Sequence, residues 1–245
     1  MNPPVVSAVS VNPEEGGIDR EIQLSVTATG TGTLSYQWYE GTSAISGATT
    51  ASYTETISDT DDTVHTYHVV VKDQYNQTTT STNVTYNSYK PPVISNIAIT
   101  SNEGTLQSST TLTATASGHN ITAHWQENKN GTWQDIGTGI PYTLNVRDSV
   151  ETLHTYRLVV TDSLGQTTTS TQTLTYQTIG LPTAGTATVS PEMGMHTQSI
   201  TLTGNSSGLG TLTYQWQKST DNSTWTNVSG ATQKVYTGTQ TISVD

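Results

Sequence analysis

The sequence lacks cysteine and phenylalanine, and only 11% of its 245 residues are charged. The absence of cysteine leaves the redox compartment open, because larger β-sandwiches can do without disulfides. The eight Lys and Arg residues are scattered and the net charge is -11, so we expect no nucleic-acid partner. No apolar run reaches eighteen residues, which predicts no membrane span in this region.

The start of the chain, MNPPVVSAV, has neither the basic segment nor the long apolar segment of a secretory signal. Two explanations stay open. Either a signal has been removed, or the protein reaches the outside without secretion, as a virion protein does.

Ser and Thr fill 78 positions, and the apolar residues occur in short runs of Val, Ile, Leu, Ala, Tyr and Trp. This composition is typical of β-strands. No window has the three-and-four spacing of an amphipathic helix, so the sequence predicts an all-β protein.

Three landmarks recur with a period of about 90 residues. Trp38, Trp125 and Trp216 are 87 and 91 residues apart, and the phrase HTY at His65 returns after 89 residues at His154. Proline pairs or Leu-Pro precede each copy. The period predicts three domains of the size of an immunoglobulin-like sandwich, at residues 1–88, 89–178 and 179–245.

Alternating apolar residues define the strands that we expect in the first repeat. These are Pro4–Val11, Glu21–Ala28, Leu34–Tyr39, Ala51–Ser58, Thr66–Lys72 and Thr78–Tyr86. Apolar residues of one parity share a face of each strand, and the second repeat has the same sets. Those sets are Leu112, Ala114 and Ala116, then Ile121, Ala123 and Trp125, then Tyr156, Leu158 and Val160.

The phrases LSYQWYEGTSAISGATTASYT, LTYQWQKSTDNSTWTNVSGAT and HTYRLVVTDSLGQTTTST resemble immunoglobulin-like and PKD-like repeats. Such repeats occur in surface proteins of archaea and bacteria (S-layer, filament and adhesin proteins) and in phage virion proteins. The resemblance covers nearly the whole chain and implies tandem β-sandwiches. It also implies that Tyr67 and Tyr156 occupy the place of a tyrosine corner, and that Val69 lies where antibody domains have a disulfide.

The third repeat is expected to be an incomplete sandwich. Asp245 aligns with Asp59, so strands A to E are present and strands F and G are missing or supplied from elsewhere. Such a sandwich would expose Tyr214, Trp216 and a strand edge. Either the sequence is a fragment of a longer chain, or strands of a neighbouring subunit complete the sheet.

Acidic residues gather in two loops that share one pole of the first predicted sandwich, near the entry to the second. Oxygen ligands that meet at such a junction suit calcium, whose binding would stiffen the joint, although a solvated acidic rim has the same composition. No cofactor is required, and calcium is the one candidate. The candidate ligands are Glu14, Glu15, Asp59, Asp61, Asp62 and Asp162.

Two further kinds of site are predicted on the surface. The motif Asn-x-Ser/Thr makes a glycoprotein possible, at Asn76, Asn83, Asn120, Asn130, Asn205, Asn222 and Asn227. In a chain so rich in Ser and Thr, chance alone produces many such motifs. Trp133 and Trp225 follow the third strand of their repeats and are candidates for stacking on sugars.

No nucleophile elbow, zinc motif or phosphate-binding Gly loop is present, so we expect no enzyme. The preferred hypothesis is a structural, extracellular array of a prokaryotic, archaeal-like surface layer, filament or adhesin at the cell surface. Its expected partners are copies of itself or other surface subunits, with glycans as candidates. The alternatives are a decoration or fibre protein of a virion surface, and a carbohydrate-binding module of a secreted enzyme.

Overall fold

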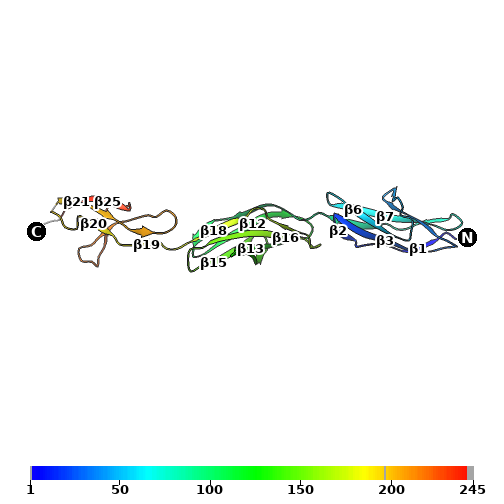
Figure 1. Cartoon of the computed structure of the whole chain (residues 1–245), viewed down its shortest axis with the longest axis horizontal. Coiled ribbons are helices and arrows are strands. Elements are labelled where there is room, and N and C mark those ends of the chain that lie inside the picture. Colours follow the sequence, from blue (N-terminus) through cyan, green and yellow to red (C-terminus); the bar gives the residue numbers. More distant parts are fainter. Residues whose placement is uncertain (1, 196, 242–245) are drawn as a thin grey trace. The chain divides into compact units, whose positions relative to one another are not determined.

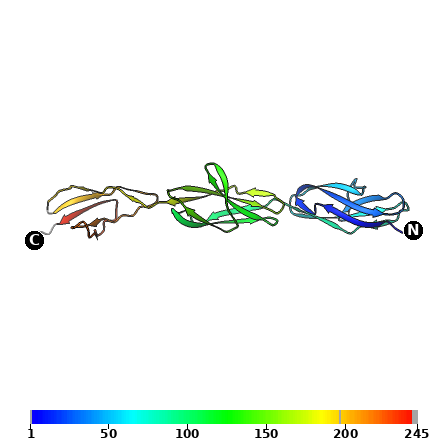
Figure 2. The same cartoon turned by 90° about the horizontal axis from the view of Figure 1, so that it is seen from below.

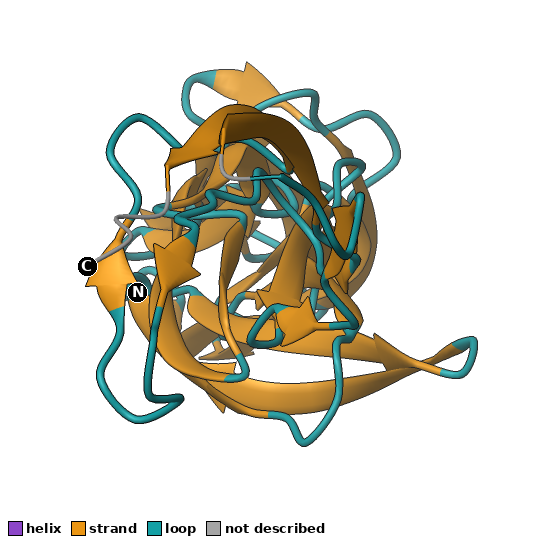
Figure 3. Ribbon diagram, turned by 90° about the vertical axis from the view of Figure 1, so that its left-hand side faces the viewer, coloured by secondary structure: helices purple, strands orange, loops and turns teal. Residues whose placement is uncertain are grey.

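The computed structural model describes residues 2–195 and 197–241, and every regular element in these ranges is a β-strand. Figure 3, coloured by secondary structure, contains strands and loops only. Within the same ranges, no helix suited to spanning a lipid bilayer is found. The prediction of an all-β fold is confirmed.

The chain forms two compact units. The first consists of Met1–Ala98, Thr113–Tyr142 and Tyr156–Thr173, and the second of Ile99–Leu112, Thr143–Thr155 and Leu174–Asp245. The division into three domains at residues 1–88, 89–178 and 179–245 stays a prediction.

The N-terminal strands of the first unit form two sheets (Figures 1 and 2). One has the order β1-β3-β6, and the other has the order β2-β9-β7-β4-β5 with β8 attached to β7. The bounds are β1 Val5–Asn12, β2 Glu15–Gly17, β3 Asp19–Thr29, β4 Ser35–Glu40, β5 Ser43–Ala44, β6 Ser52–Ser58, β7 Thr63–Lys72, β8 Thr78–Thr80 and β9 Val84–Tyr89.

Both sheets contribute side chains to one buried cluster, which makes the arrangement a β-sandwich. Alternate residues of each strand point inward, as the sequence pattern predicts. The cluster contains Val11, Ile22, Leu24, Val26, Trp38, Ala48, Ile57, Tyr67, Val69, Val71 and Tyr86. The Trp38 indole donates to the carbonyl of Thr50 at 3.0 Å, so its one polar atom is satisfied inside the core.

The predicted strands differ from the observed ones in three places. The short strands β2 and β5 lack an apolar alternation and carry no strand signal in the sequence. The predicted strand Thr78–Tyr86 is interrupted: β8 pairs with the end of β7, and β9 pairs with its beginning. Between them, the Ser81 hydroxyl accepts the Val69 backbone N–H at 3.0 Å, so a side chain replaces part of the ladder.

The tyrosine that anchors this sandwich by a hydrogen bond is on β9. The Tyr86 hydroxyl donates to the Gly17 carbonyl at 2.9 Å. The Tyr67 hydroxyl is buried without a hydrogen-bond partner, and burial raises its pKa. The hydrogen bond that a tyrosine corner at Tyr67 would make is therefore absent, and the expectation was wrong at this residue.

The next nine strands repeat the plan of the first nine. In the first unit, β13 pairs with β14 and β16, and β16 pairs with β17. In the second unit, β11 pairs with β18 in parallel, as β2 pairs with β9. The bounds are β10 Val93–Ile99, β11 Glu103–Thr105, β12 Gln107–Ser117, β13 Thr122–Lys129, β14 Thr132–Thr138, β15 Tyr142–Arg147, β16 Leu153–Thr161, β17 Thr167–Thr169 and β18 Leu174–Ile179.

The remaining strands of the second unit form one sheet of three strands, β20-β21-β25, and two pairs, β19-β22 and β23-β24. No strand follows β25 among the described residues, and Tyr214 and Trp216 are only partly covered, whereas Trp38 and Trp125 are fully buried. The incomplete third sandwich stays a prediction. The bounds are β19 Thr183–Ala184, β20 Thr188–Ser190, β21 Thr197–Thr203, β22 Ser206–Ser207, β23 Gln217–Lys218, β24 Thr226–Asn227 and β25 Val235–Thr241.

Candidate functional site

A partly buried cluster of polar side chains links three segments of the first sandwich. The Asp59 carboxylate follows β6, His65 is on β7 and Ser88 is on β9. The Nε2 atom of His65 lies 2.8 Å from Oδ2 of Asp59, and the Ser88 hydroxyl donates to the same oxygen. The other ring nitrogen of His65 lies 2.6 Å from Oε1 of Glu40 on β4. We call Asp59, His65 and Ser88 the first clamp.

The charges of the first clamp favour an ion pair. Burial lowers the pKa of His65, but the hydrogen bonds to Asp59 and Glu40 outweigh it and raise the pKa above its ordinary value. Burial likewise raises the pKa of Asp59, but the hydrogen bonds from Ser88 and His65 outweigh it and lower the pKa. Both pKa shifts reflect the mutual stabilisation of a protonated imidazole and an ionised carboxylate.

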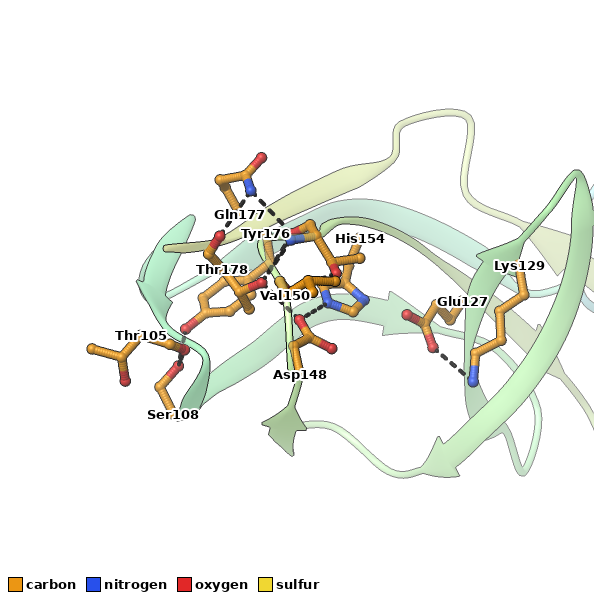
Figure 4. Close-up of polar contacts among 11 residues, drawn as sticks. Thr105, Ser108, Glu127, Lys129, Asp148, Val150, His154, Tyr176, Gln177 and Thr178 are labelled. Atoms are coloured by element: carbon orange, nitrogen blue, oxygen red, sulfur yellow. Dashed lines mark hydrogen bonds and ion pairs between the residues drawn. The ribbon is translucent and has the colours of Figure 1, made fainter. Parts of the chain in front are cut away.

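The second unit contains a second clamp of the same design (Figure 4). The Nε2 atom of His154 lies 2.8 Å from Oδ2 of Asp148, and the Thr178 hydroxyl donates to that oxygen at 2.7 Å. The pKa of Asp148 is lowered because the hydrogen bonds from His154 and Thr178 outweigh its burial. Ser and Thr therefore have one role in the two clamps, that of a hydroxyl donor to a shared carboxylate.

The connectivity of the clamps determines what they can do chemically. A nucleophilic hydroxyl needs a base within hydrogen-bond reach. In both clamps the hydroxyl and the imidazole bond to one carboxylate oxygen, so the carboxylate occupies the centre and no imidazole contact activates the hydroxyl. The arrangement ties the loop after one strand to two other strands.

The sequence analysis assigned no role to His65 and His154, and the clamps give them one. A signal was present in the sequence. An Asp precedes each His by six residues, at Asp59 and Asp148, so the pair recurs together with the HTY phrase.

The QTTTST phrases that follow each HTY strand also have polar roles. The hydroxyls of Thr79 and Thr168 donate to the carbonyls of Pro4 and Pro92, each at 2.5 Å. Ser170 accepts the Leu158 N–H at 3.1 Å, as Ser81 does for Val69. The repeated phrase therefore encodes hydrogen bonds in addition to the core.

The predicted calcium ligands have other partners. Asp61 pairs with the Lys90 ammonium at 2.6 Å, and Asp62 accepts the Lys90 backbone N–H at 2.8 Å. Asp162 is buried and caps its own turn by accepting from the N–H groups of Leu164 and Gln166. Glu14 is exposed. Within residues 2–195 and 197–241, no three acidic or His side chains gather as a metal site requires, and calcium stays a prediction.

Side chains on both sides of the linker Tyr89–Pro92 meet within the first unit. The rings of Tyr89 and His119 stack with centroids 3.7 Å apart, and Nε2 of His119 lies 3.6 Å from Oε2 of Glu15. The Gln166 amide donates to the Tyr89 carbonyl at 3.1 Å. We call Glu15, Tyr89, His119 and Gln166 the linker contact.

The seven glycosylation candidates are all exposed. Four of them, Asn76, Asn120, Asn130 and Asn222, have positive φ angles between 48° and 63°. Asn tolerates this left-handed conformation better than most residues, so tight turns alone account for these four Asn residues. Glycosylation stays a prediction.

The two tryptophans predicted to stack on sugars have different surroundings. The guanidinium of Arg157 lies 4.3 Å from the ring centroid of Trp133, so a cation covers one face of a half-buried ring. Trp225 is 53% exposed and retains an accessible ring. Trp225 is therefore the more accessible of the two candidates.

Comparison with known families and structures identifies similar proteins. A family model described as a domain of unknown function (DUF8696) matches residues 183–244. No curated protein matches the sequence. The chain is similar to the three N-terminal domains of the bacteriophage RB49 Highly Immunogenic Outer Capsid protein (Hoc), with 15% identity, coverage of 92% of this chain and 79% of that chain, and a TM-score of 0.39.

Two further solved structures are similar at low identity. The titin fragment I67–I69 has 12% identity, covers 100% of this chain and 99% of that chain, and has a TM-score of 0.48. The fibronectin(III)-like modules of Clostridium thermocellum CbhA have 18% identity, cover 70% of this chain and 93% of that chain, and have a TM-score of 0.39.

Proposed function

We propose that this chain is a non-catalytic structural segment of an extracellular protein, in which tandem sandwiches hold neighbouring parts at a fixed spacing. The linker contact is the observation that carries the proposal. A stacked ring pair and a side-chain hydrogen bond to the linker restrict the rotation of the chain at Tyr89, which a freely jointed linker would permit.

The low charge and the polar surface support the same role. Exposed Ser, Thr and Asn side chains offer lateral hydrogen bonds to neighbouring subunits, and few groups titrate when the external pH changes. The setting that we propose is a prokaryotic surface layer, filament or adhesin, with copies of the same chain or other surface subunits as partners.

The stiffness of the linker is testable with spin labels, because the chain has no native cysteine. Labels at the exposed residues Thr80 and Thr132, introduced as Thr80→Cys and Thr132→Cys, report the distance across Tyr89–Pro92. We expect a narrow distance distribution that broadens in His119→Ala and stays narrow in the control His124→Ala, which lies outside the linker contact. A broad distribution in the parent chain would contradict the spacer role.

The location is tested by immunogold electron microscopy of the native source with an antibody against this chain. We expect gold particles on a regular lattice or filament at the cell surface. Gold on capsids or tails would instead support the virion alternative, and gold on soluble particles would support a module of a secreted enzyme.

A further inference from the structure

One position of the repeat differs in a way that opens a pocket. The residue two before the central tryptophan is Tyr36 in the first repeat and Tyr214 in the third, but Ala123 in the second. Strand periodicity places each of these residues on the same face as its tryptophan. The second repeat therefore has a methyl group where the other two have a phenol ring.

The two tyrosines occupy space at the side of their sandwiches. Tyr36 is half-buried and packs against the core cluster of the first sandwich. Tyr214 lines a small pocket of about 170 Å³, and Ser206 donates to its hydroxyl at 3.1 Å. Tyr214 thus lines the pocket while its hydroxyl has a polar neighbour.

At the corresponding place in the second repeat, a pocket of about 740 Å³ lies between β12 and the hairpin of β13 and β14. This volume is within the range of small-molecule sites. Small residues enlarge it on two walls, because Ala114 stands where the first repeat has Val26 and Ala123 where it has Tyr36. The rest of the lining is formed mainly by Ala116, Ile121 and Ile140.

The strands around the pocket keep their pairing although Ala123 lacks the ring of a tyrosine. β13 keeps its ladder with β16 from Thr122 to Glu127, and Trp125 remains fully buried with its indole bonded to Gly139 at 3.1 Å. The pocket is open to solvent, and an aromatic ring that packs on its aliphatic wall removes apolar area from water without disturbing the strands.

We propose that this pocket is a binding site for one free, uncharged aromatic compound of the size of phenol or indole. The walls formed by Ala114, Ala116, Ile121, Ala123 and Ile140 would contact the ring, which takes the place that the Tyr36 side chain has in the first repeat. Thr138, an exposed residue of the lining, is the candidate partner for a polar ring substituent. Lys, Arg, Asp and Glu are absent from the lining and His124 is its one titratable residue, so the lining favours an uncharged ring.

The experiment is a titration followed by NMR of the Ala and Ile methyl groups, with phenol and indole as probes and cyclohexanol and benzoate as controls. We expect saturable shifts of the methyls of Ala114, Ala116 and Ala123, with a dissociation constant of about 1 mM or tighter for phenol or indole. Binding at least about tenfold weaker is expected for both controls. The absence of saturable shifts, or equal binding of the controls, would overturn the proposal.

Two variants fill the pocket from opposite walls, Ala123→Tyr from β13 and Ala116→Leu from β12. Each is expected to abolish the shifts, and the buried Trp125 indole resonance reports that the variant is folded. If one variant fails to fold, the other carries the test. A folded variant that binds phenol as the parent does would refute the assignment.

The same titration with a short peptide that contains Tyr separates a free compound from a protein segment. If indole or phenol binds, the proposal stands even when the peptide binds as well. If the peptide binds and neither indole nor phenol does, the pocket is a docking site for another protein and the proposal is overturned.

Discussion

The regions around Trp38 and Trp125 share a buried indole at their centre, but the chain segments beside the indole differ. Both indoles are fully buried, and both donate to a backbone carbonyl, 12 residues further on at Thr50 and 14 residues further on at Gly139. In the segment after Trp38, the carbonyl of the buried Ala48 accepts a hydrogen bond from the Trp38 backbone N–H at 3.0 Å. Beyond Trp125, the chain forms the long hairpin of β13 and β14 and leaves a pocket.

The third tryptophan follows the pattern of Trp38. The backbone N–H of Trp216 donates to the carbonyl of Ala231 at 3.0 Å, and a tyrosine, Tyr214, again stands two residues before the tryptophan. The comparison teaches that each repeat keeps its buried tryptophan, whereas the residues and the chain path beside the tryptophan differ between repeats. A binding site can therefore appear in one repeat without disturbing the fold that the repeats share.

The largest effect is expected from removal of either central ring. Trp38→Ala and Trp125→Ala each remove a fully buried side chain and should cost about 3–5 kcal/mol of local unfolding free energy. Urea denaturation followed by NMR, with the remaining indole resonances as probes of each region, measures the loss. A cost below about 1 kcal/mol in one region would break the equivalence of the two centres.

A smaller loss is expected from each clamp. Asp59→Asn and Asp148→Asn replace the shared carboxylate oxygen that accepts from both a hydroxyl and an imidazole, so each should cost about 1–3 kcal/mol. The exposed Asp135→Asn is the matched control and should have little effect. Unequal losses at Asp59 and Asp148 would show that the clamps differ in strength although both join an Asp, a His and a hydroxyl at one carboxylate oxygen.

The pH dependence isolates the first clamp. The raised pKa of His65 gives stability that is complete below its ordinary value of 6.5 and is lost as the pH rises through the folded value. The lowered pKa of Asp59 gives stability that is complete above 3.8 and is lost as the pH falls through the folded value. The urea midpoint reported by Trp38 should therefore be higher at about pH 5.5 than at about pH 8.5.

His65→Gln should remove that pH dependence, because the glutamine side chain stays neutral in this range. His68→Gln on the same strand serves as the control and should preserve it. An unchanged pH dependence in His65→Gln would assign the titration to another group.

The smallest effects are expected at the turns. Asn76 and Asn130 have φ angles of 63° and 55°, so Asn76→Gly and Asn130→Gly should change stability by less than about 0.5 kcal/mol. Valine at either position should cost about 1–2 kcal/mol, because a β-branched residue is strained in this conformation. If valine were tolerated, the turns would not explain the Asn residues.

The sequence alone predicts the strands whose apolar residues alternate, such as the run through Leu24 and the run through Val69, because burial of one face leaves a period of two. It does not predict β2, β5 or the clamps. Asp59 and Ser88 are 29 residues apart, and a polar contact of that kind leaves no periodic pattern. The hydrogen bond expected of the Tyr67 hydroxyl was wrong for the same reason, because its acceptor depends on how the loops fold.

Ala123 is visible in the sequence as the exception to the Tyr-x-Trp pattern, but the pocket is not. A small residue opens a pocket only when its neighbours leave the space unfilled, and that depends on the path of the chain from Thr138 to Ile140.

The most direct measurement is the exchange protection of the Trp38 and Trp125 indole protons in Tyr36→Ala, Ala123→Tyr and the double variant. Because the two positions are equivalent sites, one filled and one open, Tyr36→Ala should lower protection of Trp38 by about 2 kcal/mol. Ala123→Tyr should raise protection of Trp125, and the effects should add within about 0.5 kcal/mol. Loss of Trp125 protection in a folded Ala123→Tyr chain would contradict the equivalence, because it would mean that no space for a ring exists beside Trp125.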